Sequence, residues 1–227
     1  MSRLLVLTAV AAERDAILAG LGARGSDPAS GVLRVDGVHV LAAGVGIAAA
    51  AARTARWLAE PRLAGGPAYD GVISAGIGGA YAGRGDLGDT VVGRRSIAAD
   101  LGADSPAGYL TLSDLGFGTE IVDADPDLSA RMDSILPAAI HGSILSVHTV
   151  TGTAARASEL SERHPDAVAE AMEGWGVATA AADRAVPFVE VRTVSNFVGP
   201  RDRSAWRIDL AMGALTRVGE ALATLVE

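Results

Sequence analysis

The hydrophobic and polar positions of this chain divide it into short apolar runs and longer Ala-rich segments that alternate along its length. Apolar, β-branched runs of this length are typical of strands buried in an α/β sheet. We predict strands at residues 3–9, 31–35, 38–43, 70–75, 90–92, 140–150 and 186–191. We predict helices at residues 11–21, 47–58, 127–136, 153–163, 168–184 and 207–226. The alternation indicates an α/β fold: one three-layer α/β/α domain over residues 1–227, with a central mixed, twisted sheet.

Two glycine-containing turns refine this pattern. Asp36-Gly37 stands between two predicted strands and is a two-residue hairpin signal, which predicts an antiparallel pair early in the sheet. Gly44-Val45-Gly46 precedes the second predicted helix, as in a strand, turn and helix unit. A dinucleotide-binding fingerprint would need a third glycine where Ala49 stands, so dinucleotide binding is a weak interpretation.

Polar side chains follow the predicted strand at 186–191. Open α/β sheets bind their ligands just past the carboxyl ends of buried strands. The first site candidates are therefore Arg192, Ser195, Asn196, Arg201 and Asp202. For each of these five residues the alternative interpretation is an ordinary solvated loop position.

Three further stretches carry candidate chemistry. Gly76, Gly78 and Gly79 follow the strand at 70–75 and predict a turn that brings the backbone close to a ligand or to another strand. Glu173 stands among apolar and small residues of a predicted helix, where a carboxylate needs a partner. Residues 97–119 have no clear period, and their length predicts a functional or interface loop.

Composition excludes several classes of function. The chain has 227 residues, 49% of them hydrophobic and 4% aromatic, which predicts a large aliphatic core. A net charge of -8 and a pI near 5.0 argue against a nucleic-acid partner, because such binding depends on clustered Lys and Arg. The absence of cysteine from the sequence excludes disulfides, a thiolate nucleophile and a cysteine zinc site, and it fits a cytoplasmic protein.

The beginning of the chain superficially resembles a signal peptide. Arg3 precedes an apolar run that ends in Ala9-Val10-Ala11 before Glu13, but the same residues fit better as the first strand and helix. No uncharged apolar run approaches the ~20 residues that a membrane span needs, so we expect no membrane partner. The four histidines have no metal-ligand spacing, and we expect neither a metal nor a cofactor.

Four pieces of sequence stand in a fixed order and together resemble a known superfamily. They are Ala9-Val10-Ala11-Ala12-Glu13, Ala75-Gly76-Ile77-Gly78-Gly79, Ala171-Met172-Glu173 and Val191-Arg192-Thr193-Val194-Ser195-Asn196. Over essentially the whole chain this order resembles the nucleoside phosphorylase and nucleosidase superfamily, most closely its branch of 5′-methylthioadenosine/S-adenosylhomocysteine nucleosidases. Ser195-Asn196 with Gly199-Pro200-Arg201-Asp202 is similar to the futalosine hydrolase family within that branch, which serves the alternative menaquinone pathway.

The resemblance implies a role for each matching residue. Glu13 matches the carboxylate that activates a water against the anomeric carbon, although an acid in a first helical turn is also favoured by the helix dipole. Met172 and Glu173 match the pair that contacts ribose, with the glutamate accepting from the 2′ and 3′ hydroxyls. Arg192 matches an arginine that helps to order the water, and Gly76 replaces a serine beside that water. The implied substrate contacts are Gly76, Ile77, Gly78, Thr149, Val150, Met172, Glu173, Ser195, Phe197 and Arg201.

Asn196 is the main departure from the adenine-specific nucleosidases, which carry an aspartic acid at this position. Their aspartic acid protonates N7 of the leaving base and accepts from its 6-amino group. An amide cannot transfer a proton in that way, but its NH2 group can donate to N7 and O6 of a 6-oxopurine. The resemblance therefore implies release of hypoxanthine rather than adenine.

The resemblance does not by itself decide between a hydrolase, which uses water as the nucleophile, and a phosphorylase, which uses phosphate. Phosphorylases of the superfamily gather several arginines on a phosphate, whereas Glu13 would repel an anion here, so we expect water as the nucleophile. Arg14 and Arg53 keep the phosphorylase alternative open. A methylthioadenosine-type nucleosidase is the second alternative among the enzymes. A nucleoside-binding protein without turnover is the alternative from another class. We expect a small purine nucleoside as ligand and a homo-oligomer.

Overall fold

The computed structural model of the chain describes residues 3–22, 32–35, 37–63 and 68–225. Its strands are β1 (Leu4–Thr8), β2 (Val32–Val35), β3 (Val38–Ala42), β4 (Gly71–Ala80), β5 (Thr90–Ala98), β6 (Gly102–Ser105), β7 (Gly108–Thr111), β8 (Ile121–Asp123), β9 (Ile140–Ser146), β10 (Ala167–Ala171) and β11 (Phe188–Phe197). Its helices are α1 (Ala11–Gly20), α2 (Ile47–Leu63), α3 (Leu112–Leu115), α4 (Pro126–Ile135), α5 (Ala154–Arg163), α6 (Gly174–Asp183), α7 (Ile208–Ala223) and the 3-10 turn η1 (Arg203–Ala205).

One mixed sheet holds most of these strands. Across it the order is β10-β9-β5-β11-β4-β1-β3-β2, and β8 pairs with β5. β1 lies parallel to β3 and β4, and β11 lies parallel to β4, whereas β5 is antiparallel to β11. An antiparallel pairing of β10 with β4 closes β10, β9, β5, β11 and β4 into a ring. The strands of this ring and the residues next to them contribute one buried apolar cluster, formed by Ala80, Val91, Ile144, Val168, Ala169, Ala171 and Val194.

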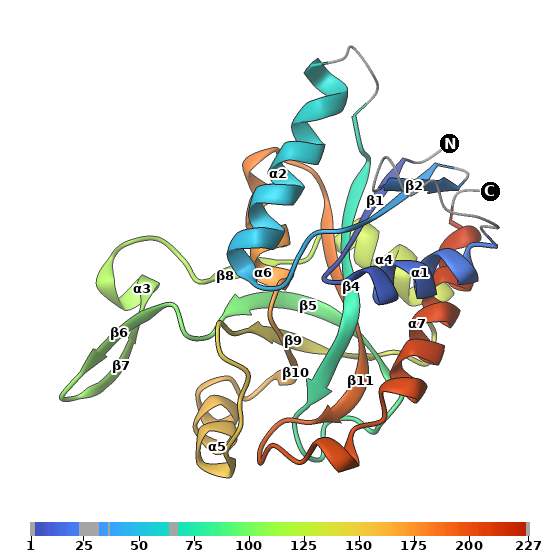
Figure 1. Cartoon of the computed structure of the whole chain (residues 1–227). Helices are drawn as coiled ribbons and strands as arrows, with labels where there is room; N and C mark the ends of the chain where they lie inside the picture. The colour runs from blue at the N-terminus through green and yellow to red at the C-terminus, as the bar shows by residue number, and fades with distance from the viewer. Residues whose placement is uncertain (1–2, 23–31, 36, 64–67, 226–227) are drawn as a thin grey trace.

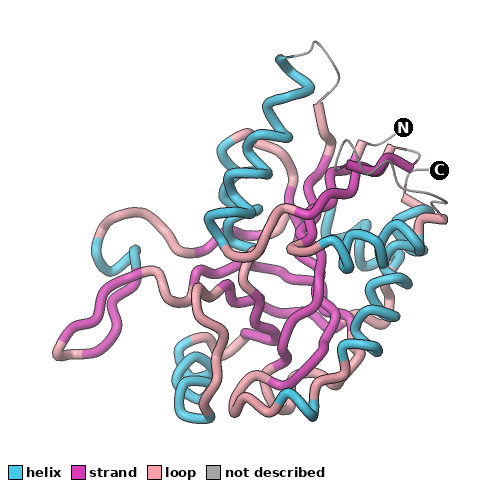
Figure 2. Tube along the Cα trace, viewed as in Figure 1, coloured by secondary structure: helices cyan, strands magenta, loops and turns pink. Residues whose placement is uncertain are grey.

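Helices cover both faces of the sheet (Figures 1 and 2). On one face Ile17 of α1, Met132 of α4 and Leu215 of α7 pack in a single buried cluster with strand residues. On the opposite face Leu58 of α2 and Val177 of α6 do the same. The α/β/α layers and the mixed central sheet predicted from the sequence pattern are confirmed.

β4 and β11 are longer than the sequence pattern predicts. Gly76, Gly78 and Gly79, predicted to form a turn, lie inside β4. Arg192 and Asn196, predicted to follow a strand, lie inside β11 together with Ser195. The two strands pair in parallel along their whole length, and the ladder hydrogen bonds keep both glycine-rich and polar segments extended. The turn and loop predictions are therefore wrong at these positions.

The predicted helix at 168–184 is wrong in its first part. Residues 167–171 form β10, which pairs with β9 on one edge and with β4 on the other. An Ala-rich apolar run fits a buried strand as well as a helix, and only the two neighbouring strands decide between them. α6 begins at Gly174, so Glu173 occupies the N-cap position in front of the helix instead of a helical turn.

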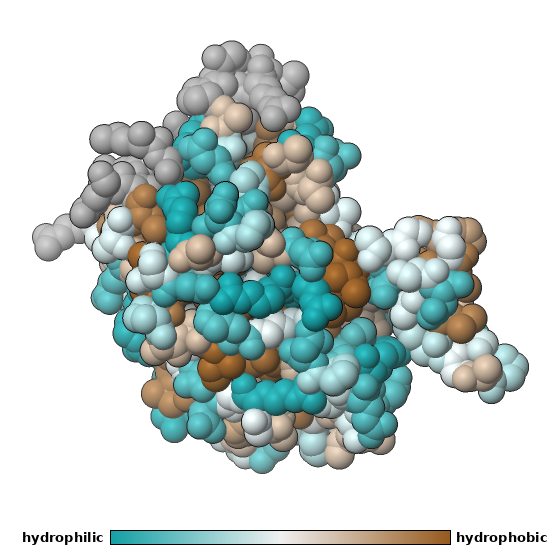
Figure 3. Space-filling view, turned by 180° about the vertical axis from the view of Figure 1, so that it is seen from behind, coloured by the Kyte–Doolittle hydropathy of each residue, from teal (hydrophilic) through white to brown (hydrophobic). Residues whose placement is uncertain are grey.

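Residues 97–119, predicted as an irregular loop, contain regular structure. The segment completes β5 and then forms the β6–β7 hairpin and the short helix α3. This extension stands away from the body of the molecule in Figure 1, and Figure 3 shows it from behind with hydrophobic residues on its surface. Phe117 in it is 77% exposed.

Other local predictions are confirmed. β2 and β3 form the expected antiparallel hairpin, in which Gly37 has a φ of 90°; Asp36 lies outside the described residues. Thr153 caps α5, because its side chain accepts a hydrogen bond from the Arg156 backbone N–H at 3.2 Å. No helix in the described part of the chain is long and apolar enough to cross a membrane.

Candidate active site

A cavity of about 380 Å³ lies where the carboxyl ends of β1, β4 and β11 approach β10. Segments from distant parts of the sequence line it, from the turn after β1 to the loop before α7. The lining residues are Ala9, Val10, Glu13, Val45, Ile77, Gly78, Gly79, Val150, Thr151, Glu170, Ala171, Met172, Glu173, Ser195, Asn196, Phe197, Val198, Gly199, Pro200, Arg201 and Trp206. Three carboxylates and one cationic side chain are among them.

Glu13 is held at the cavity wall by backbone donors. One carboxylate oxygen, Oε2, accepts from the N–H groups of Ala9 and Val10 at 2.9 and 3.2 Å. The other, Oε1, accepts from the N–H of Ile77 in β4 at 2.9 Å. Glu13 is only 4% exposed, so these three bonds fix the orientation of its carboxylate. The first turn of α1 is thereby tied to the strand that forms the cavity floor.

Arg192 is a buried cation among carboxylates. Its Nε donates to Glu190 Oε1 at 2.9 Å, its Nη1 lies 3.3 Å from Glu173 Oε2, and its Nη2 donates to Ser74 Oγ at 3.1 Å. Burial lowers the pKa of Arg192, but the negative charges of Glu190, Glu173 and Glu13 outweigh this and raise the pKa overall. The guanidinium is 1% exposed and does not line the cavity; it supports the carboxylates from beneath.

Glu173 reaches the cavity from the N-cap of α6. Its Oε1 accepts from the N–H of Gly46 at 3.1 Å, and its Oε2 faces Arg192. Gly46 has a φ of 93°, a conformation that glycine adopts without strain. Glu173 is 7% exposed and lines the cavity, so its carboxylate can still accept from a ligand there.

Gly76 explains how Glu13 and Arg192 come together. A Cβ at this position would lie 2.7 Å from both Arg192 Nη1 and Glu13 Oε1. The space that a serine side chain would occupy is therefore taken by the guanidinium and the carboxylate. Gly76 itself does not line the cavity, because these two side chains lie between its Cα and the open space.

Asn196 lies at a bulge in β11. The register between β11 and β4 shifts between Val194 and Asn196, which makes Ser195 the extra residue. Ser195 Oγ lies 2.8 Å from Asn196 Oδ1, and Asn196 Nδ2 donates to the carbonyl oxygen of Phe197 at 3.0 Å. The Ser195 hydroxyl is also 3.1 Å from the Gly78 carbonyl oxygen. Nδ2 carries two N–H groups, and the second has no partner among the described residues although Asn196 lines the cavity, so it is available to a ligand there.

Glu170 is a third carboxylate at the cavity and projects from β10. Its Oε1 accepts from the Thr151 N–H at 2.8 Å, and its Oε2 accepts from Thr151 Oγ1 at 2.5 Å and from the Tyr81 hydroxyl at 3.3 Å. Burial raises the pKa of Glu170, and the bonds from Thr151 and Tyr81 oppose that rise. This carboxylate holds the loop after β9 against the cavity.

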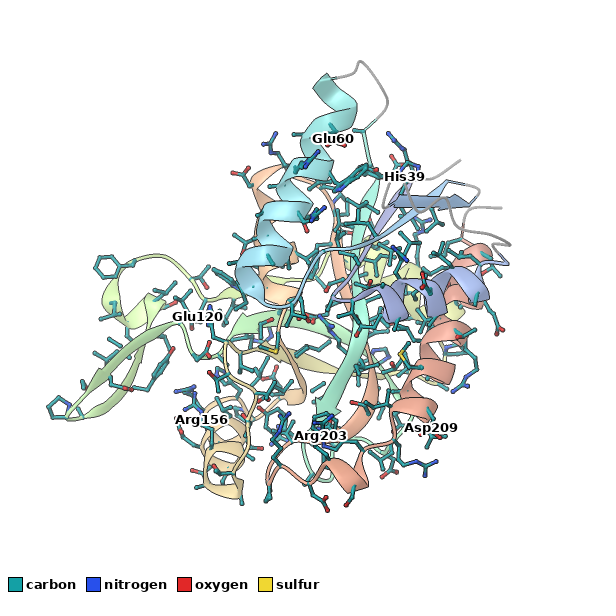
Figure 4. The ribbon with its side chains drawn as sticks, viewed as in Figure 1. His39, Glu60, Glu120, Arg156, Arg203 and Asp209 are labelled. Carbon is teal, nitrogen blue, oxygen red and sulfur yellow. The ribbon has the colours of Figure 1, made fainter. Side chains whose placement is uncertain are left out.

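The segment between β11 and α7 supplies the cationic side of the cavity. Arg201 lines it, and the Arg201 guanidinium carbon lies 5.1 Å from the centre of the Trp206 ring. Arg207 instead pairs with Asp209, with Nη2 3.1 Å from Oδ2. Arg203 lies in the same segment but outside the cavity lining (Figure 4). Among the described residues no carboxylate pairs with Arg201, and Asp202 accepts instead from the backbone N–H of Ser204 at 3.0 Å.

Most of the predicted site residues come together at this cavity. Those that line it are Glu13, Ile77, Gly78, Val150, Met172, Glu173, Ser195, Asn196, Phe197 and Arg201. Arg192 and Gly76 lie beneath it. Thr149 is exposed in the loop after β9 and does not line it, whereas its neighbour Thr151 does.

Two acidic residues were missed by sequence reasoning. Glu190 could have been found, because it stands two positions before Arg192 in an apolar run, and alternate residues of a strand share a face. Burial raises the pKa of Glu190, and the Arg192 charge opposes that rise. Glu170 was missed because residues 168–184 were predicted as a helix, and a helix there gives no reason to place Glu170 next to β4. The described residues contain no group of three or more His, Cys, Asp or Glu that could hold a metal ion.

Comparison with known proteins places the chain among nucleoside-processing enzymes. The family model described as the phosphorylase superfamily matches residues 17–227. The futalosine hydrolase of Streptomyces coelicolor is 50% identical over 228 residues, which cover 99% of this chain and 96% of that protein. The futalosine hydrolase of Acidothermus cellulolyticus is 45% identical over 227 residues, which cover 97% of this chain and 89% of that protein.

Solved structures show the same fold. A 5′-methylthioadenosine/S-adenosylhomocysteine nucleosidase from Colwellia psychrerythraea in complex with adenine superposes with a TM-score of 0.80 at 20% identity, covering 99% of this chain and 94% of that one. The native structure of futalosine hydrolase of Helicobacter pylori superposes with a TM-score of 0.77 at 17% identity, covering 99% and 97%. The predicted fold class is confirmed.

We expect Gly76→Ala to destabilise the protein by about 1–3 kcal/mol, because the added methyl group overpacks a buried site. It should also lower kcat by displacing Glu13. Gly213→Ala is the matched control: Gly213 is exposed in α7, its Cβ would meet only Arg217 Nη1 at 3.9 Å, and the alanine should leave stability equal or higher. Urea unfolding of both variants measures the difference. Equal stability of the two variants would show that Gly76 is not under steric constraint.

Proposed function

The chain belongs to the phosphorylase superfamily and, within it, to the family of the futalosine hydrolases, and we propose on that premise that it hydrolyses the N-glycosidic bond of futalosine and releases hypoxanthine. The observation that carries the proposal is the placement of Glu13, Glu173 and Asn196 around one cavity. These three side chains supply a base, an acceptor for a diol and a donor for a purine. We also propose that this reaction is a step of the alternative menaquinone pathway.

Glu13 is the proposed general base. Its carboxylate takes a proton from a water molecule as the water oxygen bonds to the anomeric carbon and the bond from that carbon to the purine nitrogen breaks. The three backbone N–H groups that hold Glu13 keep it aimed during this step. The bonding electrons pass to the purine, whose developing negative charge is stabilised by the Asn196 N–H at N7 and O6.

Glu173 is the proposed ribose ligand. Its carboxylate accepts from the 2′ and 3′ hydroxyls, and its negative charge favours the positive charge that develops on the ribosyl group as the bond breaks. Arg192 holds Glu173 in position, with 3.3 Å between Nη1 and Oε2. Met172 lines the cavity beside Glu173 and supplies an apolar contact to the sugar.

The charges at the cavity favour water over phosphate as the nucleophile. Glu13, Glu170 and Glu173 are the carboxylates of its lining, and Arg201 is the one cation among the described lining residues. Arg14, which kept the phosphorylase alternative open, pairs with Asp15 at 2.8 Å. Arg53, the other candidate, is exposed on α2 outside the lining. A phosphate dianion at the anomeric carbon would meet Glu13 without a cluster of cations to offset the repulsion.

Three further parts of the proposal concern the ligand, the oligomeric state and the location. A small purine nucleoside as the ligand is supported by the size and lining of the cavity. A homo-oligomer is supported by the exposed side chain of Phe117, in the extension that follows β5. A cytoplasmic location is supported by a sequence without cysteine.

The proposed reaction is tested by incubating the protein with futalosine, inosine and methylthioadenosine, each with and without phosphate, and measuring the free base. We expect hypoxanthine from futalosine at a rate that phosphate does not change. Faster release with phosphate, together with ribose 1-phosphate products, would make the protein a phosphorylase. Preferred release of adenine would make it a methylthioadenosine-type nucleosidase, and ligand binding without any free base would make it a binding protein.

Glu13→Gln is expected to lower kcat by ~10²- to 10⁴-fold, the contribution of a general base, because the amide keeps the shape of the side chain but cannot take the proton. Binding of hypoxanthine should be largely retained. Asp15→Asn on the same helix is the control, since Asp15 is exposed and outside the cavity lining. Turnover by Glu13→Gln at the wild-type rate would remove Glu13 from the mechanism.

Arg201 is the proposed ligand for the anionic end of the substrate. Futalosine carries a benzoate on its 5′ extension, whereas inosine has no such group. Arg201 is the cation of the described lining, and its guanidinium over the Trp206 ring is positioned to meet a carboxylate in a bidentate pair. Arg203 and Arg207, the rivals on the same segment, do not line the cavity.

Arg201→Met is therefore expected to lower kcat/KM for futalosine by roughly tenfold to hundredfold, the value of a charge-assisted hydrogen bond, and to leave inosine almost unchanged. Arg203→Met is the matched control and should change neither substrate. The measurement is initial-rate kinetics on both nucleosides with the three proteins. Equal losses on futalosine and inosine would mean that Arg201 serves the conformation of its loop.

A further inference from the structure

Glu170 and Asn196 lie on either side of Gly79 in the lining of the cavity. In the sheet Gly79 of β4 is the register partner of Glu170 in β10 on one side and of Asn196 in β11 on the other. Directly paired residues point to the same face of a sheet. A Cβ on Gly79 would lie 3.0 Å from both Asn196 Nδ2 and Val198 Cγ2, so the glycine lets the Asn196 amide lie against β4 at the edge of the cavity. The backbones of β10 and β11 are roughly 9–10 Å apart across β4, which leaves room for one edge of a flat base.

Glu170 has acceptor capacity that the protein does not use. An ionised carboxylate offers about four lone-pair sites. The three donors that reach it are the Thr151 N–H, the Thr151 hydroxyl and the Tyr81 hydroxyl. One site therefore remains, on Oε1, which accepts only the Thr151 N–H among the described donors. Glu170 lines the cavity and keeps 6% of its surface exposed.

The two side chains complement one edge of a 6-oxopurine. Asn196 has a free N–H, which suits the acceptors N7 and O6. Next to O6 on the same ring stands N1–H, a donor that has no partner in Asn196. A 6-aminopurine reverses this edge, since its N1 is an acceptor and its 6-amino group is a donor. A carboxylate that faces N1 accepts a hydrogen bond from the N1–H of a 6-oxopurine. The same carboxylate is repelled by the N1 lone pair of a 6-aminopurine.

We infer that Glu170 reads the N1–H of the leaving purine and is, with Asn196, a determinant of specificity for 6-oxopurines. This inference rests on the proposed nucleosidase function, and it adds Glu170 as a second side chain that contacts the purine base. The discrimination is large because a buried carboxylate placed against a mismatched base leaves polar groups unpaired. The competing explanation is that Glu170 only holds the loop of Thr151, in which case it would act on all substrates alike.

Glu170→Gln separates these explanations. A glutamine side chain can turn either its carbonyl oxygen or its NH2 group toward the base. It can therefore accept from the N1–H of a 6-oxopurine or donate to N1 of a 6-aminopurine, and the preference for 6-oxopurines is lost. We expect kcat/KM for inosine to fall roughly tenfold to hundredfold, and kcat/KM for adenosine to stay level or rise. The ratio of the two values is the readout. Tyr81→Phe is the control: it removes one donor to Glu170 from outside the cavity lining and should leave this ratio unchanged.

Binding of the free bases tests the inference without turnover. By calorimetry, Glu170→Gln should weaken hypoxanthine roughly tenfold to hundredfold and adenine much less. The wild-type protein should bind 1-methylhypoxanthine, which lacks the N1–H, correspondingly more weakly than hypoxanthine, and this comparison does not depend on the folding of any variant. Parallel losses on both purines, or equal wild-type affinity for hypoxanthine and its 1-methyl derivative, would overturn the assignment. Selective hypoxanthine binding without any hydrolysis would instead overturn the proposed function and leave the assignment of Glu170 standing.

Discussion

The structure depends on a single buried guanidinium. Arg192 is 1% exposed and pairs with Glu190 and Glu173, while the carboxylate of Glu13 lies against the same Gly76 position. Taking such charges out of water is costly, and removing one member of a buried pair leaves the other unpaired at a cost of about 3–5 kcal/mol. Glu190 and Glu173 are therefore balanced by the arginine, whereas Glu13 is held in addition by three backbone N–H groups. Two of the three carboxylates, Glu13 and Glu173, also face the cavity, so the same electrostatic balance that stabilises the core positions the groups proposed to act on a nucleoside.

Close approach of the backbone is the condition for this cluster. Gly76 leaves the space that Arg192 and Glu13 fill, and Gly174 lets the start of α6 lie directly on the Glu190 carboxylate, where a Cβ would collide with it. Gly79 of β4 likewise leaves space that the side chains of Asn196 and Val198 take, next to Glu170 in β10. Two glycines of β4, Gly76 and Gly79, therefore lie against polar side chains, and the extended conformation of the strand is maintained by β11 and β10 on either side.

The ring of β10, β9, β5, β11 and β4 explains why the site has two chemically different ends. At one end the turn after β1 and the N-cap of α6 bring Glu13 and Glu173 together, above Arg192. At the other end β10 and β11 present Glu170 and Asn196 to either side of Gly79. A nucleoside has the same polarity, with a diol and a reacting carbon at one end and a hydrogen-bonding base at the other. The loop of Arg201 and Trp206 adds a cation and an aromatic ring to the lining.

The sequence by itself determined the layers, most of the helices and strands, and the acidic, amide and glycine residues from which the site is built, because apolar periodicity and residue chemistry are local properties. Glu173 and Asn196 were found in this way, whereas Glu13 was assigned through the resemblance to the nucleosidases. Arg201 was singled out among three arginines by its position after Asn196. Whether residues 167–171 form a helix or a strand was decided only by the tertiary structure, because an Ala-rich run suits both and pairing with β9 and β4 selects the strand. The same pairing determines the place of Glu170 beside the cavity, and pairing with β4 keeps Arg192 to Phe197 extended beyond the predicted strand end. A long-range contact also brings Glu173 from the N-cap of α6 to the Glu190–Arg192 pair of β11, since no local pattern places these two elements side by side.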